Sequence, residues 1–478
     1  MMIAGDIMLK NSSVRARALC CIAAVLVVVV FAFLPSDGEL SFSAKMSLGL
    51  LLAGVVLWVG EPVPFAISGL AIMIGIPVFG ILPWQPGDGP TVWVEFISSV
   101  IFFILASFGL SAALLKTKVP MKIVYALLKL SKGRTEGVLL AFMASTACVS
   151  LFVSDIPCCA LFAGIAMSTI LTFEEAEPGT SKLGRALMIA IPYAAAIGGQ
   201  AFPSGSSMNI MAIGLLESLT GVHISFLQWA AICAPIAVIL LGAAWLSICL
   251  VHKPEAISQK TIDRVAEIAT SEERLDSLDR KVLFVIGITF ALWISSNWTG
   301  WDATGIAVFG LVLLFLPGID VLDIDEYVAS VSWNMLILVG SVQALAGGMK
   351  EQGAASWLLG STVGKIGLGA APLVCASSVM IPLMRLFIPV GPALIAIALP
   401  PLCLLGAEAG ISPVFFTIVC AISASTSLMN GLDSISMIAY RYDYWNLVDY
   451  LKSGLLPTAV LMACHALMLL PLIHAVGL

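Results

Sequence analysis

The sequence predicts an all-α polytopic membrane protein with about eleven transmembrane helices and two re-entrant hairpins in an inverted repeat. Three observations support this fold class. Of the 478 residues, 60% are hydrophobic and 11% are charged, whereas soluble domains contain about 45–50% apolar and about 25% charged residues. Apolar segments follow one another along almost the whole chain, and short motifs recur in the same order in its two halves.

The composition also excludes several functional classes. The 23 Lys and Arg residues against 29 Asp and Glu leave no basic surface for DNA or RNA. The 11 cysteines lie mostly inside apolar runs, and their spacing indicates neither a disulfide framework nor a metal site. We find no phosphate-binding Gly-Lys-Ser/Thr motif and no Ser/His/Asp arrangement. We therefore expect a protein that is not an enzyme and that needs no organic cofactor.

The amino-terminal region predicts the first crossing. Lys10, Arg15 and Arg17 precede an apolar run from Ala18 to Leu34. This run is longer than the apolar part of a signal peptide. We expect an uncleaved helix in a multi-pass protein of the cell inner (plasma) membrane, with the amino terminus in the cytoplasm.

Interruptions in the apolar segments predict irregular structure at membrane depth. Two pairs of short segments are joined almost without a loop, and we expect re-entrant hairpins at 137–172 and 371–406. At 1.5 Å per residue, each arm reaches only part of the way across a hydrocarbon core about 30 Å thick. Two longer segments, 186–216 and 412–440, are interrupted by stretches rich in Gly, Ser and Asn. Non-helical backbone inside the membrane is tolerated only where it is buried in the protein or lines a water-filled cavity.

The interruptions match because the chain repeats itself. Leu57-Trp58 recurs as Leu292-Trp293, Lys116 as Lys350, and Gly205 as Gly431, at nearly one spacing. A polar connector rich in Lys and Arg separates the halves, so the second half starts inverted, its hairpin enters from outside and the chain ends outside. The predicted divisions are an amino-terminal segment with the first helix at 1–45, a first repeat with the cytoplasmic-side hairpin at 46–252, a cytoplasmic connector at 253–281, and a second repeat with the external-side hairpin and last helix at 282–478.

The hairpin tips and the interruptions hold the candidate site, because half-helix amino termini supply free N–H groups and a positive dipole end for an anion. The candidate substrate-binding residues are Ser154, Asp155, Ser204, Gly205, Ser206, Ser207, Asn209, Arg385, Gly391, Pro392, Asp433 and Ser434. Asp155 and Asp433 are also candidates for binding a coupling ion, since carboxylates at bilayer depth usually mark a pathway or a pair. Asp155 is alternatively an ordinary helix N-cap. Arg385 either holds an anion, extends toward the membrane surface, or pairs with Asp155 or Asp433.

This order of elements resembles the divalent-anion:sodium symporter family of the ion-transporter superfamily. The resemblance covers roughly residues 50–475 and includes the stretch Trp333–Gly340, the pair Gly198-Gly199, and the spacing from Gly205 to Asn209. It implies a homodimer in which Ser-Asn-Thr motifs at both tips contact a substrate carboxylate while the tip backbone helps to bind sodium. This chain differs there: the first tip reads Ser154-Asp155-Ile156-Pro157, and the second reads Val390-Gly391-Pro392.

We therefore expect a secondary active transporter for small anions, with di- or tricarboxylates implied by the resemblance, that works by elevator-type alternating access. Because the tips lack the family's motif, we predict sodium-independent exchange or proton coupling. The expected partners are the anion, the lipid bilayer and a second copy of the chain. Three alternatives remain: a sodium-coupled dicarboxylate symporter, a passive anion channel of the same fold, and an intramembrane enzyme or signalling protein.

Overall fold

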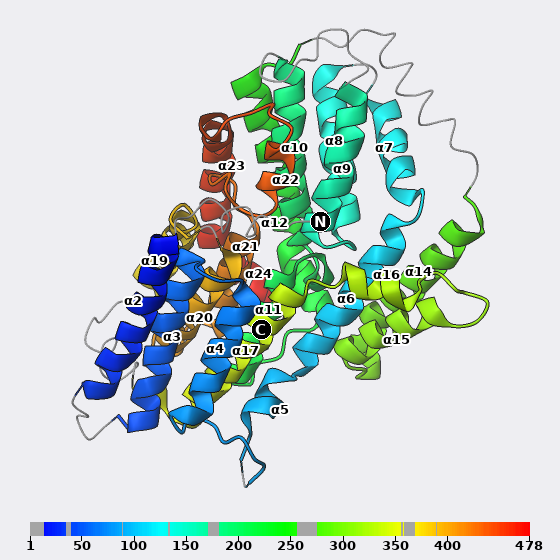
Figure 1. The fold of residues 1–478 in the computed structure, drawn as a ribbon. Helices are drawn as coiled ribbons and strands as arrows, with labels where there is room; N and C mark the ends of the chain where they lie inside the picture. Colours follow the sequence, from blue (N-terminus) through cyan, green and yellow to red (C-terminus); the bar gives the residue numbers. More distant parts are fainter. Residues whose placement is uncertain are drawn as a thin grey trace.

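The computed structural model describes residues 14–34, 40–87, 89–131, 134–170, 181–255, 275–354, 357, 369–388 and 390–478. These residues form α-helices and one short 3-10 helix, and they contain no β-strand. The all-helical fold class predicted from composition is therefore confirmed (Figure 1). Most of the predicted connector, and the basic residue Lys10, lie outside the described residues.

The first half of the chain follows the predicted apolar segments closely. Its elements are α2 (Val14–Phe33), α3 (Phe42–Gly60), α4 (Phe65–Val78), α5 (Val92–Phe96), α6 (Ser99–Leu115), α7 (Val119–Leu130), α8 (Thr135–Ser150), α9 (Asp155–Ile170), α10 (Lys182–Gly199), η1 (Pro203–Gly205), α11 (Ser207–Thr220) and α12 (Phe226–His252). Helix α2 leaves most of its large apolar side chains exposed, including Leu19, Val25 and Phe33. An apolar helix of this length with an exposed apolar surface suits a position facing lipid.

The second half repeats this order after the connector. Its elements are α14 (Ser277–Thr299), α15 (Ala303–Phe315), α16 (Ile324–Ser330), α17 (Trp333–Glu351), α19 (Ala370–Met384), α20 (Gly391–Glu408), α21 (Pro413–Ser425), α22 (Ser436–Tyr440), α23 (Leu447–Leu467) and α24 (Leu469–Ala475). Helices α10 and α21, the first parts of the two interrupted segments, are buried over almost their full length. They therefore form the centre of the molecule.

Among the described residues, five helices are long and apolar enough to cross a membrane, or six if α16 and α17 are counted together across their 62° bend. Seven shorter apolar helices accompany them, including both arms of each predicted hairpin. The count of about eleven crossings depends on how these shorter helices combine, and it stays a prediction.

Three described helices lie outside the predicted apolar segments, namely the short α5, α7 and α16. Helix α7 carries Lys122 and Lys129 on an otherwise apolar sequence, and its charges had indicated only a cytoplasmic loop. Helix α16 is short, and its start is set by a capping box in which the Asp323 side chain accepts from the Glu326 amide at 2.8 Å. The spacing Asp-x-x-Glu was visible in the sequence as a helix start.

Both predicted hairpins are present as pairs of short helices. Helices α8 and α9 pack against each other and are joined by residues 151–154, and α19 and α20 do the same across residues 385–390. Both predicted interruptions are present as well, between α10 and α11 and between α21 and α22. We refer to these two interrupted segments as break 1 and break 2.

The two interrupted segments cross at the centre of the molecule. Helix α10 packs against α22, and α11 packs against α21 (Figure 1). The first part of each segment thus lies beside the second part of the other, which is the pairing that two segments running in opposite directions produce. The second arms of the hairpins follow the same rule, since α9 packs against α22 and α20 against α11. Both hairpin tips are thereby brought to the crossing.

The predicted inverted topology can be tested with single cysteines in a cysteine-depleted background. We expect a cysteine near Thr135, at the start of the first hairpin, to react with a membrane-impermeant thiol reagent from the cytoplasm. A cysteine near Gly369, at the start of the second hairpin, should react from outside. Labelling of both positions from one side of the membrane would contradict the inverted repeat.

Candidate functional site

The tip of the first hairpin presents a buried carboxylate. Asp155 begins α9 and is 5% exposed. Its Oδ2 accepts a hydrogen bond from the Ser206 hydroxyl at 2.9 Å, and its Oδ1 accepts from the Ile156 amide at 2.9 Å and from the Ser154 hydroxyl at 3.3 Å. The bond to Ile156 is local, as expected of a residue at a helix start, whereas the bond to Ser206 joins the hairpin to break 1. Asp155 is thus the first residue of α9 and not its N-cap, and its role at a coupling-ion or substrate site stays a prediction.

An amide side chain holds break 1 open. The Asn209 Nδ2 donates to the carbonyls of Gly199 and Phe202, both at 2.9 Å. These carbonyls lie where the helix is interrupted and lose their ordinary helical partners there. The Asn209 Oδ1 is buried without a partner among the described residues. Asn209 thus satisfies the broken backbone, and Ser207 opens the following helix as the first residue of α11.

Break 1 and the first tip touch through backbone atoms as well. A Cβ on Gly205 would lie 2.5 Å from the Gly199 carbonyl oxygen and 2.7 Å from that of Ser150, closer than real Cβ atoms approach. Glycine is therefore required at this position for packing. The Ser204 hydroxyl donates to the Leu151 carbonyl at 3.4 Å, beside this contact. The predicted grouping of Ser204, Gly205 and the first tip is present in the structure.

The tip of the second hairpin contains a buried guanidinium group. Arg385 follows α19 directly and is 6% exposed. Its Nη1 donates to the Ile388 carbonyl at 2.9 Å, and its Nη2 lies 3.4 Å from the Asp433 Oδ2. Its Nε is buried and has no partner among the described residues. Of the three interpretations left open for Arg385, the structure shows the pairing, with Asp433 as the partner.

The start of α20 is packed against both interrupted segments. A Cβ on Gly391 would lie 2.8 Å from the Ala424 carbonyl oxygen of α21 and 2.9 Å from the Met208 sulfur of α11. Pro392 occupies the first turn of α20, where its missing N–H costs no hydrogen bond. The second tip therefore meets the crossing through a closely fitted backbone.

Break 2 is organised by Asp433, which is 4% exposed. Its Oδ1 accepts from the amides of Ile435 and Ser436, at 3.0 and 2.8 Å, and from the Ser436 hydroxyl at 2.7 Å. The other oxygen, Oδ2, faces Arg385. Ser434, the predicted serine, is exposed and contributes none of these bonds. Its role in substrate binding stays a prediction.

The residues missed from sequence are Ser436, Asn430 and Tyr193. Ser436 stands three residues after Asp433, the spacing of a helix cap, so a capping pattern could have identified it. The Asn430 side chain donates to the Arg385 carbonyl at 3.2 Å. The Tyr193 hydroxyl lies 2.6 Å from the Leu428 carbonyl oxygen. Neither contact leaves a signal in the sequence, because each joins residues far apart in the chain.

The two halves of the candidate site meet at the crossing. The Cys159 thiol of α9 lies 3.4 Å from the Ile435 carbonyl oxygen of break 2. Asp155 begins α9, and α9 packs against α22, the helix that follows Asp433. The arrangement therefore places one cation and two carboxylates, with hydroxyl donors around them, at a buried point between the hairpin tips. Such a group can bind an anion or a small cation.

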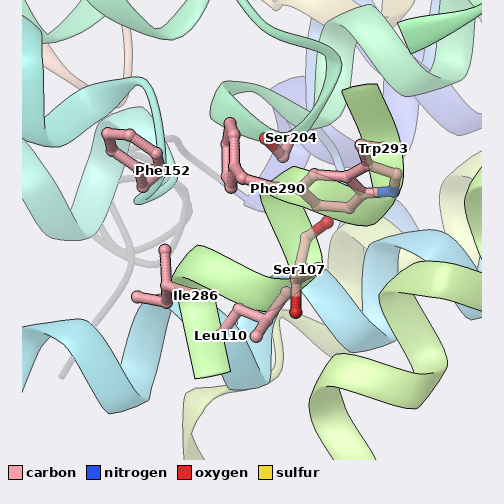
Figure 2. A pocket seen from close by; sticks show the side chains of 8 residues that line it. Ser107, Leu110, Phe152, Ser204, Ile286, Phe290 and Trp293 are labelled. Carbon is pink, nitrogen blue, oxygen red and sulfur yellow. The ribbon is translucent and has the colours of Figure 1, made fainter. Parts of the chain in front are cut away.

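A small cavity lies on the other side of the first tip (Figure 2). Its volume is about 10 Å³, enough for about one water molecule. Figure 2 shows Ser204 of break 1 and Phe152 of the tip facing Ser107 of α6 and Phe290 and Trp293 of α14. The Ser107 hydroxyl is buried and has no partner among the described residues. This cavity is too small for an organic dianion.

Aromatic rings fill the space around this cavity. Phe152 of the first tip packs on Phe290 of α14, with ring centroids 4.5 Å apart. Phe226 of α12 stacks on Trp293 of α14 at 4.6 Å, and Phe202 of break 1 lies 5.5 Å from Phe290. The rings have no hydrogen bonds that fix their relative position, apart from the indole N–H of Trp293, which donates to a carbonyl within its own half. We refer to these five rings as the aromatic cluster.

Comparison with known proteins identifies the family. Residues 15–474 match the sodium:sulfate symporter transmembrane region. The chain belongs to the sodium:sulfate symporter family. This match confirms the resemblance to divalent-anion:sodium symporters drawn from the motifs. As a member of this family, the chain is a membrane transporter and not an enzyme.

Two relatives and one solved structure are similar to this chain over most of its length. The sodium-dependent dicarboxylate transporter SdcS of Staphylococcus saprophyticus is 29% identical over 433 residues, which cover 84% of this chain and 80% of that protein. SdcS of Staphylococcus aureus strain USA300 is 26% identical over 356 residues, covering 68% of this chain and 66% of that protein. The crystal structure of the Alcanivorax borkumensis YdaH transporter matches with a TM-score of 0.54 at 12% identity, over 89% of this chain and 99% of that chain. That similarity shows the fold alone.

The close approach at Gly205 predicts a selective loss of stability. Gly205→Ala should lower the free energy of unfolding by about 1–3 kcal/mol, because its Cβ overpacks the contact with Gly199 and Ser150. Gly164→Ala, on α9, is the matched control, since nothing lies within 4 Å of its Cβ. Gly164→Ala should stabilise the protein slightly, because alanine favours helix by up to about 1 kcal/mol over glycine. Thermal unfolding of the purified variants measures both effects, and equal melting temperatures would contradict the close packing.

Proposed function

We propose that this family member is a secondary active transporter for small dianions, with dicarboxylates as its substrates, and that it works without sodium. The observation that carries the proposal is the buried group of Arg385, Asp155 and Asp433 between the two hairpin tips. The amino-terminal ends of α9, α11 and α20 also reach this point. Together they offer N–H, hydroxyl and guanidinium donors to a carboxylate. The relatives named as dicarboxylate transporters support the substrate class.

The absence of sodium coupling is supported by the residues at the tips. The second tip, Val390-Gly391-Pro392, supplies no side-chain oxygen for a sodium ion. At the first tip, the oxygens of Asp155 accept three hydrogen bonds from within the protein. Importing a dianion against an inside-negative potential of 100 mV costs about 4.6 kcal/mol, at about 2.3 kcal/mol per charge. Exchange of one anion for another of equal charge avoids this cost, and proton coupling through Asp155 offsets part of it.

We further propose that transport follows an elevator movement of one part of the chain against another. The moving part contains the hairpins and interrupted segments, α8–α11 and α19–α22, which pack on one another at the crossing. The scaffold contains the remaining helices, among which α4 packs on α17 and α6 on α15. The aromatic cluster lies between the two parts, and its contacts are made by dispersion and can slide. The Ser111 hydroxyl of α6 donates to the Phe152 carbonyl at 3.4 Å and accepts from the Ser154 amide at 3.2 Å, so these two hydrogen bonds would break in the movement. The two repeats would be residues 46–252 and 282–478, joined by the cytoplasmic connector.

Two features of the assembly complete the proposal. A cytoplasmic amino terminus follows from Arg15 and Arg17 before the first crossing. A homodimer is supported by the resemblance to the family, and the exposed apolar surface of α2 suits either lipid or a second copy. The competing functions are a sodium-coupled dicarboxylate symporter, as the names of the relatives suggest, and a passive channel of the same fold.

Uptake into proteoliposomes separates these functions. With external sodium replaced by choline, we expect uptake of a radiolabelled dicarboxylate to stay within about twofold of its value in sodium, because no sodium ion takes part. Internal unlabelled substrate should accelerate uptake in an exchanger. In a proton symporter, an inward proton gradient should accelerate uptake of the radiolabelled dicarboxylate.

Each rival function has its own signature in this assay. A sodium-coupled symporter would lose uptake in choline, and that result would contradict the proposal. A channel would show no acceleration by internal substrate and no response to a proton gradient beyond the change in membrane potential. Liposomes without protein supply the background flux.

A further inference from the structure

We propose that Arg385 is a resident cation of the transport site, a positive charge built into the second hairpin that removes the need for a mobile cation there. The inference rests on the proposed function and specifies which charge the protein itself supplies. It starts from a difference between the two halves of the site. They occupy matching positions in the fold, but their charged side chains differ.

The surroundings of Arg385 are those of a cation site. The guanidinium group lies between a carboxylate oxygen of Asp433 at 3.4 Å and the carbonyl oxygen of Ile388 at 2.9 Å, which follows the end of α19. Carbonyl and carboxylate oxygens are the ligands that small hard cations prefer. The Arg385 side chain therefore occupies oxygen ligands that would otherwise attract a cation from solution.

The first half of the site has the oxygens but not the cation. Asp155 is held by Ser206, Ser154 and the Ile156 amide, which are all neutral donors. Within the described part of the chain, no Lys, Arg or His side chain forms an ion pair with Asp155. In the second half, the Arg385 side chain neutralises Asp433. In the first half, Asp155 has no such side chain, and a cation from solution has to neutralise it.

Charge balance gives this difference a consequence. Arg385 and Asp433 neutralise each other, so Asp155 is the one unbalanced charge of the group when all three side chains are ionised. A dianion bound beside it is repelled unless a single mobile cation neutralises Asp155. If Arg385 were neutral, two carboxylates would be unbalanced, and a second mobile cation would be needed. Arg385 therefore lowers by one the number of mobile cations, protons included, that the site needs when a dianion is bound.

The buried Nε of Arg385 adds a second, independent observation. It has no partner among the described residues, although a buried N–H without an acceptor is costly. An acceptor arriving from solution, such as a substrate carboxylate, would satisfy it. The resident cation is thus placed to contact the substrate without leaving Asp433.

The test replaces the resident cation and asks whether a mobile one can take its place. Arg385→Ser should lower dicarboxylate uptake in choline by at least tenfold, and sodium or lithium at 100 mM should restore uptake at least threefold. Arg441→Ser is the matched control, because Arg441 lies exposed just after α22. It should keep uptake within about twofold of wild type in both salts. Wild-type uptake in choline, measured alongside, tests the proposed function separately.

A double variant guards against a simple failure to fold. Arg385→Ser combined with Asp433→Ser removes both charges of the pair and avoids leaving a buried carboxylate alone. The double variant keeps the net charge of the wild-type site. Its uptake in choline should therefore exceed the uptake of the single variant Arg385→Ser by at least threefold. The inference is overturned if Arg385→Ser transports normally in choline. It is equally overturned if no alkali cation restores the single variant and the double variant stays inactive, since Arg385 would then serve only to hold the substrate or the fold.

Discussion

The need to balance buried charge is the constraint on which the centre of this protein depends. Moving an ionised side chain out of water costs several kcal/mol even after relaxation, unless partners replace the water. Asp155, Arg385 and Asp433 are all at most 6% exposed. Each has one partner that is distant in sequence, Ser206 for Asp155, and Arg385 and Asp433 for each other. Their charges are therefore fully satisfied only once the crossing of the interrupted segments has formed. The hairpins, the interruptions and the close-packed glycines together bring these partner residues into contact.

The two halves meet the constraint in different ways. In break 1, the neutral Asn209 amide satisfies the free carbonyls, and the carboxylate belongs to the hairpin. In break 2, Ile435 stands where Asn209 stands in the first half, and the carboxylate belongs to the interruption itself. There Asp433 accepts from the Ser436 amide at the start of α22 and pairs with Arg385 of the hairpin. Two halves with the same order of hairpin and interrupted segment thus differ in charge, and we infer that this difference sets how many ions the site takes from solution.

Much of the fold was visible in the sequence because a bilayer restricts the chain to helices of limited length. Apolar runs with Gly and Pro between them located the hairpins and the interruptions, and the elements α8–α11 and α19–α22 follow them closely. The sequence did not show which side chains contact each other where the two interrupted segments cross. The spacing along the chain allowed Arg385 either carboxylate as its partner, because a contact between distant segments leaves no local periodicity. Helices α7 and α16 were missed because each is too polar at one end to register as an apolar run.

The most direct test of this account is the linkage between sodium and substrate binding. Binding of succinate to the purified protein would be measured by titration calorimetry over a hundredfold range of sodium at constant ionic strength, with choline as the replacement. If sodium is not part of the site, the dissociation constant stays the same across the range. If each bound anion brings sodium with it, the dissociation constant falls at least tenfold for each tenfold rise in sodium below saturation. That result would contradict the claim that this protein binds and transports its substrate without sodium.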